Sequence, residues 1–394
     1  MRPEVVHIFN SSRVSGPETL ALPALGQLGV PVAVIFLSEE RCGVAGRRAI
    51  VYAGQLGLQV HEVKVRRRGD LAAVRTLGYL LSALGPKIAH AHDVKASTYL
   101  LAAARTSNYA GAIYSTHHGI HGRPDWKTKL YERFYSHGIL PRFDRVLAVS
   151  SADRAELIGR GLDPEKVQLH LNGADARAVS PAERPALSRR IRAAWGVPVE
   201  PLIIGLVGRL SFEKRHDRAL AVAWQLERLM PELDWRLVCF GFGKLEAELA
   251  AQTARLGLEK RVQWMGYRPR VGDEMAGFDL LLSLSDAEGL PINLIEAGWA
   301  ATPVLATAVG GVCDLLGQPP AGVLVRPSDD PARIAQQIRL LAEAPARREG
   351  LGRALRDRVI QKFSRRAWLD RLRELYAPYL SDARQVREGE QQRA

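Results

Sequence analysis

Two glutamates eight positions apart, Glu288 and Glu296, stand in the stretch SDAEGLPINLIEAGWA (residues 285–300), which is otherwise mostly small and apolar. Carboxylates are rarely buried unless a partner donates hydrogen bonds to them. Pro291 suits the first turn of a helix, where its missing N–H has no cost. Glu288 is therefore expected in a strand-to-helix loop, and Glu296 about a turn and a half into the helix. The pair alone would also fit an ordinary helix with an acid at each end.

The predicted start of this helix favours an anion. The free amides of the first turn, around Ile292 and Asn293, have no acceptor within the helix and attract negative charge. Carboxylates only accept hydrogen bonds, so they suit the hydroxyl groups of a sugar. The stretch therefore predicts a nucleotide-sugar site, with phosphates on the amides and hydroxyls on Glu288 and Glu296.

Cations stand at a second strand exit. Arg209 and Lys214 follow the apolar run at 202–208 in GRLSFEKRHD, and two cations there suit a diphosphate, although two solvated surface charges would look the same. Gly16 precedes a helical pattern after the first strand, where a glycine lets the backbone approach a phosphate, or simply makes a turn. Neither GxGxxG nor GxxxxGK[ST] occurs, which disfavours a dinucleotide fingerprint or a P-loop.

Histidines concentrate in the first half of the chain. His117 and His118 end a predicted strand in YSTHHGIHG, and His121 follows. No cysteine or HExxH helix accompanies them, so no metal site is expected. One histidine at the strand exit would face the site, or both are structural.

Two series of short β-type runs alternate with helical patterns, which predicts α/β architecture with parallel sheets covered on both faces. Two such series imply two Rossmann-like, doubly wound domains facing a central cleft. We expect an N-terminal acceptor-side domain over residues 1–180 and a C-terminal nucleotide-sugar domain over 181–362. Residues 363–394 are expected to form a helix that packs back towards the N-terminal domain, followed by a polar tail.

Composition narrows the function class. The 394 residues carry a net charge of +13, of which +8 lies in residues 1–180, with 23 Lys and Arg against 15 Asp and Glu. Such a surface would suit an anionic membrane or a phosphorylated acceptor, or would simply be solvated. No nucleic-acid reading motif accompanies it. The absence of a bilayer-length apolar run, of a signal peptide and of paired cysteines predicts a cytoplasmic protein, either free or bound peripherally at the inner face of the cytoplasmic membrane.

The motifs SGPE (15–18), THHG (116–119), NGAD (172–175), GRLSFEK (208–214), EGLPINLIEA (288–297) and ATPVLATAVGG (301–311) occur in this order. Together they resemble the retaining glycosyltransferases of family 4, which have the GT-B fold. The resemblance covers residues 3–380. It implies transfer of a sugar from a UDP- or GDP-sugar to a glycan or lipid-linked acceptor, in polysaccharide or lipopolysaccharide biosynthesis, with no metal or other cofactor.

The resemblance also implies roles for individual residues. Glu288 would contact the transferred sugar, and His118 would touch the sugar or the reacting centre, with His117 as the alternative in a register ambiguous by one. The implied donor-binding residues are Gly16, Arg209, Lys214, Leu290, Ile292, Asn293 and Glu296. Arg209 and Lys214 would neutralise the diphosphate in place of a metal ion, while Glu296 would bind the ribose.

The chain departs from the family pattern at a few positions. Arg215 follows the lysine where glycine is common, Ala301 precedes Thr-Pro where glycine is usual, and Ala308 replaces an aspartate. These changes put the donor sugar in doubt more than activity. Two alternatives stay open, namely a GT-B epimerase or hydrolase of nucleotide sugars and a non-catalytic GT-B binding subunit.

Overall fold

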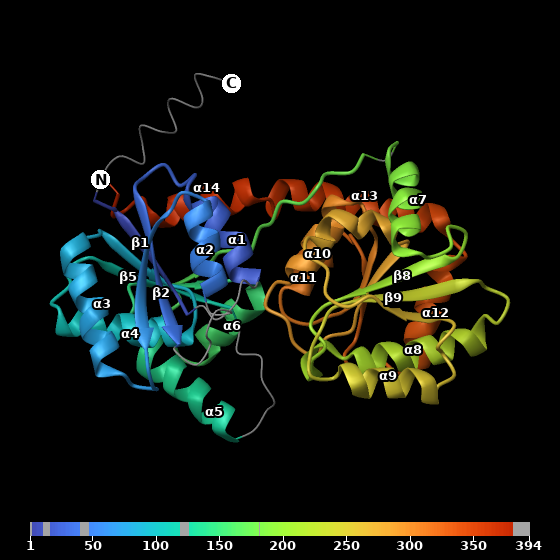
Figure 1. The fold of residues 1–394 in the computed structure, drawn as a ribbon, viewed down its shortest axis with the longest axis horizontal. Helices are drawn as coiled ribbons and strands as arrows, with labels where there is room; N and C mark the ends of the chain where they lie inside the picture. Colours follow the sequence, from blue (N-terminus) through green and yellow to red (C-terminus); the bar gives the residue numbers. More distant parts are fainter. Residues whose placement is uncertain (1, 11–15, 40–46, 119–125, 181, 381–394) are drawn as a thin grey trace. The chain divides into compact units, whose positions relative to one another are not determined.

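The structure is a computed structural model that describes residues 2–10, 16–39, 47–118, 126–180 and 182–380. These residues pack into two compact units (Figure 1). Unit 1 holds the described residues up to Asn172 together with those from Arg365 onward, and unit 2 spans Gly173–Ser364. The chain therefore changes unit eight residues before the expected boundary at 180.

Unit 1 is built on a parallel sheet with strand order β3-β2-β1-β4-β5-β6-β7. Its strands are β1 Val5–Phe9, β2 Val32–Glu39, β3 Gln59–Val65, β4 Ile88–Ala91, β5 Ala112–His117, β6 Arg145–Ala148 and β7 Val167–Leu169. Its helices are α1 Gly16–Leu25, α2 Arg48–Gln55, α3 Leu71–Leu84, α4 Val94–Thr106, α5 Trp126–Arg133, α6 Ser151–Gly159 and α14 Arg365–Tyr376, with a π-helical turn η2 Phe134–Ile139 and a 3₁₀ turn η3 Leu140–Arg142.

Unit 2 repeats this plan with strand order β10-β9-β8-β11-β12-β13, again parallel. Its strands are β8 Leu202–Val207, β9 Trp235–Phe240, β10 Val262–Trp264, β11 Leu280–Ser283, β12 Val304–Thr307 and β13 Val323–Val325. Its helices are α7 Arg184–Trp195, α8 His216–Leu229, α9 Glu246–Arg255, α10 Ile292–Trp299, α11 Val312–Leu316, α12 Pro331–Ala342 and α13 Pro345–Lys362, with 3₁₀ turns η4 Phe212–Lys214 and η5 Val271–Gly277.

The central strands of both sheets are buried along their whole length, as β1 and β11 illustrate. Helices cover both faces of such sheets, because parallel strands need crossover connections and have two faces to bury. The predicted doubly wound α/β class is confirmed in each unit. None of the helices in the described ranges combines the length and the hydropathy that crossing a bilayer requires.

Helix α14 packs on unit 1, although it follows unit 2 in the chain. Its inner side consists of Trp368, Leu369, Leu372 and Tyr376, all buried. The carbonyl oxygen of Trp368 lies 3.1 Å from Nε2 of His170, and the carbonyl oxygen of Leu375 accepts a 2.8 Å hydrogen bond from the hydroxyl of Tyr114.

Candidate functional site

The site of unit 2 lies where the strand order of its sheet reverses. Strands β8 and β11 are neighbours, with Leu282 paired to Leu206. From β8 the chain continues outward to β9 and β10, whereas from β11 it continues outward to β12 and β13 on the other side. The loops after β8 and β11 therefore leave the same edge in opposite directions, which creates the crevice where open α/β sheets bind ligands.

An ion pair joins these two loops. Lys214, at the end of η4 after β8, places Nζ 2.5 Å from Oε1 of Glu288, which lies in the loop after β11. The hydroxyl of Ser285 donates a 2.6 Å hydrogen bond to the same oxygen. Glu288 is buried, and Lys214 is partly exposed. The two residues are 74 positions apart in sequence, so the sheet itself creates the pair.

The loop that carries Glu288 is held on its other side by the exit of β12. Thr307 donates a 2.5 Å hydrogen bond to the carbonyl oxygen of Ser285, and the amide of Gly311 donates one of 2.5 Å to that of Gly289. Gly310 has φ +47, and a Cβ there would overlap the carbonyl oxygen of Glu288. The loop after β12 therefore needs glycine at this position, and it holds the backbone on both sides of Glu288 in place.

Helix α10 begins at Ile292, and Pro291 is its N-cap residue rather than its first helical residue. No side chain caps this end among the described residues. The side-chain amide of Asn293 donates a 2.7 Å hydrogen bond to the carbonyl oxygen of Val207, which ties the helix to the end of β8. The first-turn amides of α10 therefore lie at the switch point, where an anion would complete their hydrogen bonding.

Glu296 extends from α10 towards η5. Its carboxyl packs against Gly272, where a Cβ would come within 2.6 Å of Cδ. Burial, and to a lesser degree the nearby Asp273, raises the pKa of Glu296 from its ordinary 4.5 to about 7. A carboxyl whose charge is poorly solvated gains from hydroxyl donors, which is what a ribose would supply.

The other expected site residues differ in how exposed they are and in which unit they lie. Arg209 is exposed just beyond β8, Leu290 is buried, and Ile292 is half-buried at the start of α10. Gly16 is the first residue of α1 in unit 1, and the residues just before it lie outside the described ranges, as does His121.

The two histidines at the end of β5 have different surroundings. His117 is buried and stacks on Tyr135, with ring centroids 5.8 Å apart. His118 is half-buried and lies on the His92 side, with ring centroids 6.4 Å apart. This arrangement favours His118 as the residue closer to the switch point of unit 1, because His92 directly follows β4 there.

Comparison with known proteins identifies the family. The model of glycosyl transferases group 1 matches residues 188–358, and the model of glycosyltransferase family 4 matches residues 21–178. The two matches fall on unit 2 and unit 1 respectively, apart from a few residues at the junction. This chain belongs to the family 4 type of glycosyltransferases.

Relatives and solved structures agree with that family. D-inositol 3-phosphate glycosyltransferase 1 of Catenulispora acidiphila is 30% identical over 253 residues, covering 62% of this chain and 58% of that protein, so the match spans little more than half of the relative. The putative glycosyltransferase EpsF of Bacillus subtilis is 25% identical, covering 90% of this chain and 89% of that protein. Anabaena Alr3699/HepE, solved in complex with UDP, has a TM-score of 0.81 at 20% identity, covering 95% of this chain and 100% of that one. The last likeness supports the GT-B fold.

The departures from the family's glycines have a physical meaning in this glycosyltransferase. Arg215 has φ +50 and Ala301 has φ +51, the left-handed region that favours glycine. The guanidinium of Arg215 is held by Asp217 and by Asp286, which lies in the loop after β11. Arg215 thus has a backbone conformation that is unfavourable for a non-glycine residue, but its side chain forms a second link between the two loops of the site.

Two members of the site were missed from the sequence. Ser285 ends the apolar run LLLSLS and gave no signal, because its role depends on the turn of the following loop. His216 begins α8, is buried, and has no hydrogen-bond partner on either ring nitrogen among the described residues. Burial and, less strongly, the charge of Lys214 lower the pKa of His216 to about 4. The His216 ring and the Lys214 side chain both lie against Gly208 at the end of β8, so a neutral imidazole adjoins the lysine of the site.

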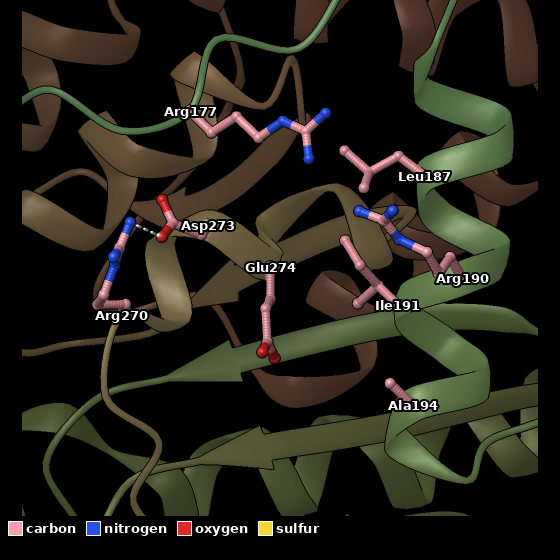
Figure 2. A pocket seen from close by; sticks show the side chains of 8 residues that line it. All are labelled: Arg177, Leu187, Arg190, Ile191, Ala194, Arg270, Asp273 and Glu274. Carbon is pink, nitrogen blue, oxygen red and sulfur yellow. Dashed lines mark ion pairs between the residues drawn. The ribbon is translucent and has the colours of Figure 1, made fainter.

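A separate hollow of about 510 Å³ lies between α7, η5 and the chain near Arg177 (Figure 2). Arg190 points into it from α7, and Arg270 pairs with Asp273 at 2.6 Å on its other side. Asp273 is also the charge that raises the pKa of Glu296.

Proposed function

We propose that the protein transfers a sugar from a UDP- or GDP-sugar to a hydroxyl of a glycan or lipid-linked acceptor, with retention of anomeric configuration. The observation that carries this proposal is the contact between Lys214 and Glu288 beside the uncapped start of α10, at the switch point of a parallel sheet. The cation and the helix N-terminus suit the diphosphate of a nucleotide sugar. The carboxylate beside them suits the hydroxyls of the sugar that is linked to this diphosphate.

The diphosphate would bind to Lys214 and the amides of Ile292 and Asn293. An ammonium group has three hydrogens to donate, and Glu288 takes one, which leaves two for phosphate oxygens. The exposed Arg209 adds a second cation. These donors stabilise the negative charge that develops on the leaving diphosphate, the usual largest contribution to such catalysis. We propose that they make a divalent metal unnecessary.

The sugar would bind to Glu288. Both hydrogen bonds that this carboxylate makes within the described residues use Oε1, so Oε2 keeps its lone pairs for sugar hydroxyls. Glu296 would accept from the ribose hydroxyls on the other side of the diphosphate. Anabaena Alr3699/HepE was solved with UDP and with UDP-glucose, which supports a uridine donor here.

In the transfer step, the bond between the anomeric carbon and the diphosphate oxygen breaks, and the acceptor oxygen bonds to the same face of that carbon. The acceptor proton passes to the leaving phosphate oxygen, so no protein base is needed. His118 would contact the sugar or the acceptor. The protein would mainly position the reactants and stabilise charge.

A transfer assay tests this proposal. UDP-, GDP-, ADP- and CMP-sugars are first screened by thermal shift, since a ligand of the folded state raises its melting temperature. The donor that binds is then incubated with a glycan acceptor, and the anomeric proton of the product is measured by NMR. Product with the donor's anomeric configuration supports the proposal. Epimerised donor, or free sugar alone, would indicate an epimerase or a hydrolase, and donor binding without turnover would indicate a binding subunit.

We also propose that unit 1 contacts an anionic membrane surface on the cytoplasmic side. Leu130, Tyr131 and Phe134 are exposed on α5 and η2, and Arg66, Arg67 and Arg68 are exposed after β3. Exposed apolar residues together with cations are typical of interfacial binding. In liposome flotation, binding should increase with the share of anionic lipid. Equal flotation with neutral and anionic liposomes would contradict this proposal.

A further inference from the structure

A continuous chain of hydrogen bonds crosses the core of unit 1. Nε2 of His92 lies 2.7 Å from Nδ1 of His7, and Nε2 of His7 lies 3.4 Å from the hydroxyl of Tyr376. The same hydroxyl is bonded to Nδ1 of His90, whose Nε2 lies 2.7 Å from the hydroxyl of Thr116. All five side chains are buried. We call this set the histidine chain.

The sheet explains why these residues meet. His7 on β1 is the direct neighbour of His90 on β4. His92 lies two residues after His90 and therefore on the same face, because side chains alternate along a strand. By the same rule Thr116 shares a face with Tyr114, the neighbour of His90 on β5. Helix α14 covers this face and brings Tyr376 between the two histidine strands.

The hydrogen bonds of the histidine chain all run in one direction, which follows from counting protons. Burial lowers the pKa of His7 to about 3 and lowers the pKa of His90 and His92 well below the ordinary value, so each imidazole is neutral and carries one N–H. Each ring then donates with one nitrogen and accepts with the other. If Thr116 donates to His90, then His90 donates to Tyr376. Within the described residues the hydroxyl hydrogen of Tyr376 then has His7 as its remaining partner, so the bonds continue in the same direction through His7 to His92. If Thr116 accepts, all the bonds reverse.

Both ends of the histidine chain reach the end of β5. Thr116 is the residue before His117, and at the other end the ring of His92 lies 6.4 Å from that of His118. The described residues of the THHG motif, 116–118, thus adjoin the histidine chain at both of its ends. Since the bonds must share one direction, a change at Tyr376 in the middle reaches both ends.

Removing the hydroxyl of Tyr376 would leave Nδ1 of His90 and Nε2 of His7 without that partner. Both rings are fully buried, where an unpaired polar atom is costly. One of the two rings loses the acceptor of its N–H, and the other loses the donor to its bare nitrogen. Each ring must then change its tautomer or turn to find a new partner. A turn of His90 would release the hydroxyl of Thr116, and a turn of His7 would release His92.

We propose that Tyr376 is a positioning residue for transfer: through His90 and His7 it fixes Thr116 and His92, and thereby the orientation of His118 at the end of β5. The inference rests on the proposed function, since it gives His118 a contact with the reactants. It assigns to α14 a role beyond covering the sheet, because one hydroxyl of this helix sets the geometry of residues 116–118.

Tyr376→Phe tests the proposal against a matched control, Tyr114→Phe. The hydroxyl of Tyr114 bonds to the carbonyl oxygen of Leu375, so it holds the same helix without a hydrogen bond to the histidine chain. Tyr376→Phe should lower kcat about tenfold or more, with the affinity for nucleotide unchanged within about twofold, whereas Tyr114→Phe should keep kcat within about twofold. An equal loss of kcat in both variants, or no loss in Tyr376→Phe, would overturn the proposal.

Substitutions of Thr116 provide a second test of the proposal. Thr116→Val should lower kcat as Tyr376→Phe does, Thr116→Ser should restore it, and the double variant should lose no more than either single one. Losses that multiply in the double variant would contradict a single connected chain.

Ring ¹⁵N spectra give a readout that needs no turnover. Tyr376→Phe should shift the resonances of His118 together with those of His90 and His7, and an unmoved His118 would overturn the proposal. An absence of transfer by the unmodified protein with every donor would instead count against the proposed function, and the spectra would still decide the role of Tyr376.

Discussion

Replacing Glu296 with glutamine should make the folded protein more stable at neutral and alkaline pH. Burial and Asp273 raise the pKa of this carboxyl from 4.5 to about 7. One pKa unit corresponds to about 1.4 kcal/mol, so full burial would make the ionised form cost up to about 3 kcal/mol. The side chain is partly exposed, and screening by solvent reduces the expected cost to about 1–3 kcal/mol.

The pH dependence follows from the sign of this shift. Between pH 4.5 and about 7 the folded state keeps the proton of Glu296 that the unfolded chain has lost. The stabilisation from this group is therefore full below pH 4.5 and is lost as the pH rises through about 7. Glu296→Gln has no such loss. Its gain in stability over the unmodified protein should therefore increase between pH 4.5 and 7 and stay constant above pH 7.

Thermal unfolding without nucleotide, at pH 4.5, 6 and 8, measures the effect. The gain should be roughly 2–4 °C per kcal/mol for a unit of this size. Glu248→Gln, the same substitution on the exposed side of α9, serves as the control and should change little. The variant should also bind the donor at least about tenfold more weakly, since an amide replaces a charged acceptor. A gain independent of pH, or a loss of stability at pH 8, would refute the reasoning.

Three further predictions concern the site and its backbone. Glu288→Ala should lower kcat about 10²-fold, the scale of losing one stabilising group in the transition state; near-normal turnover in a donor-saturated assay would remove Glu288 from the site. Ala301→Gly should raise the free energy of unfolding by about 0.5 kcal/mol, because φ +51 costs alanine more than glycine loses in entropy, whereas Ala300→Gly, at φ −85, should lower it. Transfer should persist in excess EDTA, and a loss of activity that a divalent ion restores would contradict the proposed use of Lys214 in place of a metal.

The central strands could be predicted from the sequence because both of their faces are buried, which gives continuous apolar runs such as VVHIF and LLLSLS. Strands β3, β7 and β13 lie at sheet edges and carry no long apolar run; β7 and β13 have three residues each. QVHEVKV of β3, for example, has only two buried residues. The order of strands and helices along the chain predicted the doubly wound architecture, but it did not predict which strands lie at the sheet edges.

The site shows a similar division. Glu288, Lys214 and the start of α10 could be placed at strand exits because parallel strands end at one edge. The contact between Lys214 and Glu288 could not, since it joins residues 74 apart and depends on β8 lying next to β11. The histidine chain gave no pattern either, because His7, His90 and Tyr376 come from three distant segments that only the folded sheet brings together.

The measurement that tests the central claim most directly is calorimetric titration of UDP- and GDP-sugars into the unmodified protein and into Lys214→Ala. At least one donor should bind the unmodified protein, and Lys214→Ala should bind it at least about tenfold more weakly, because a charge-assisted bond to phosphate is lost. Equal affinity in the two proteins, or no binding of any donor to the unmodified protein, would contradict the assignment of the crevice between β8 and β11 as the nucleotide-sugar site.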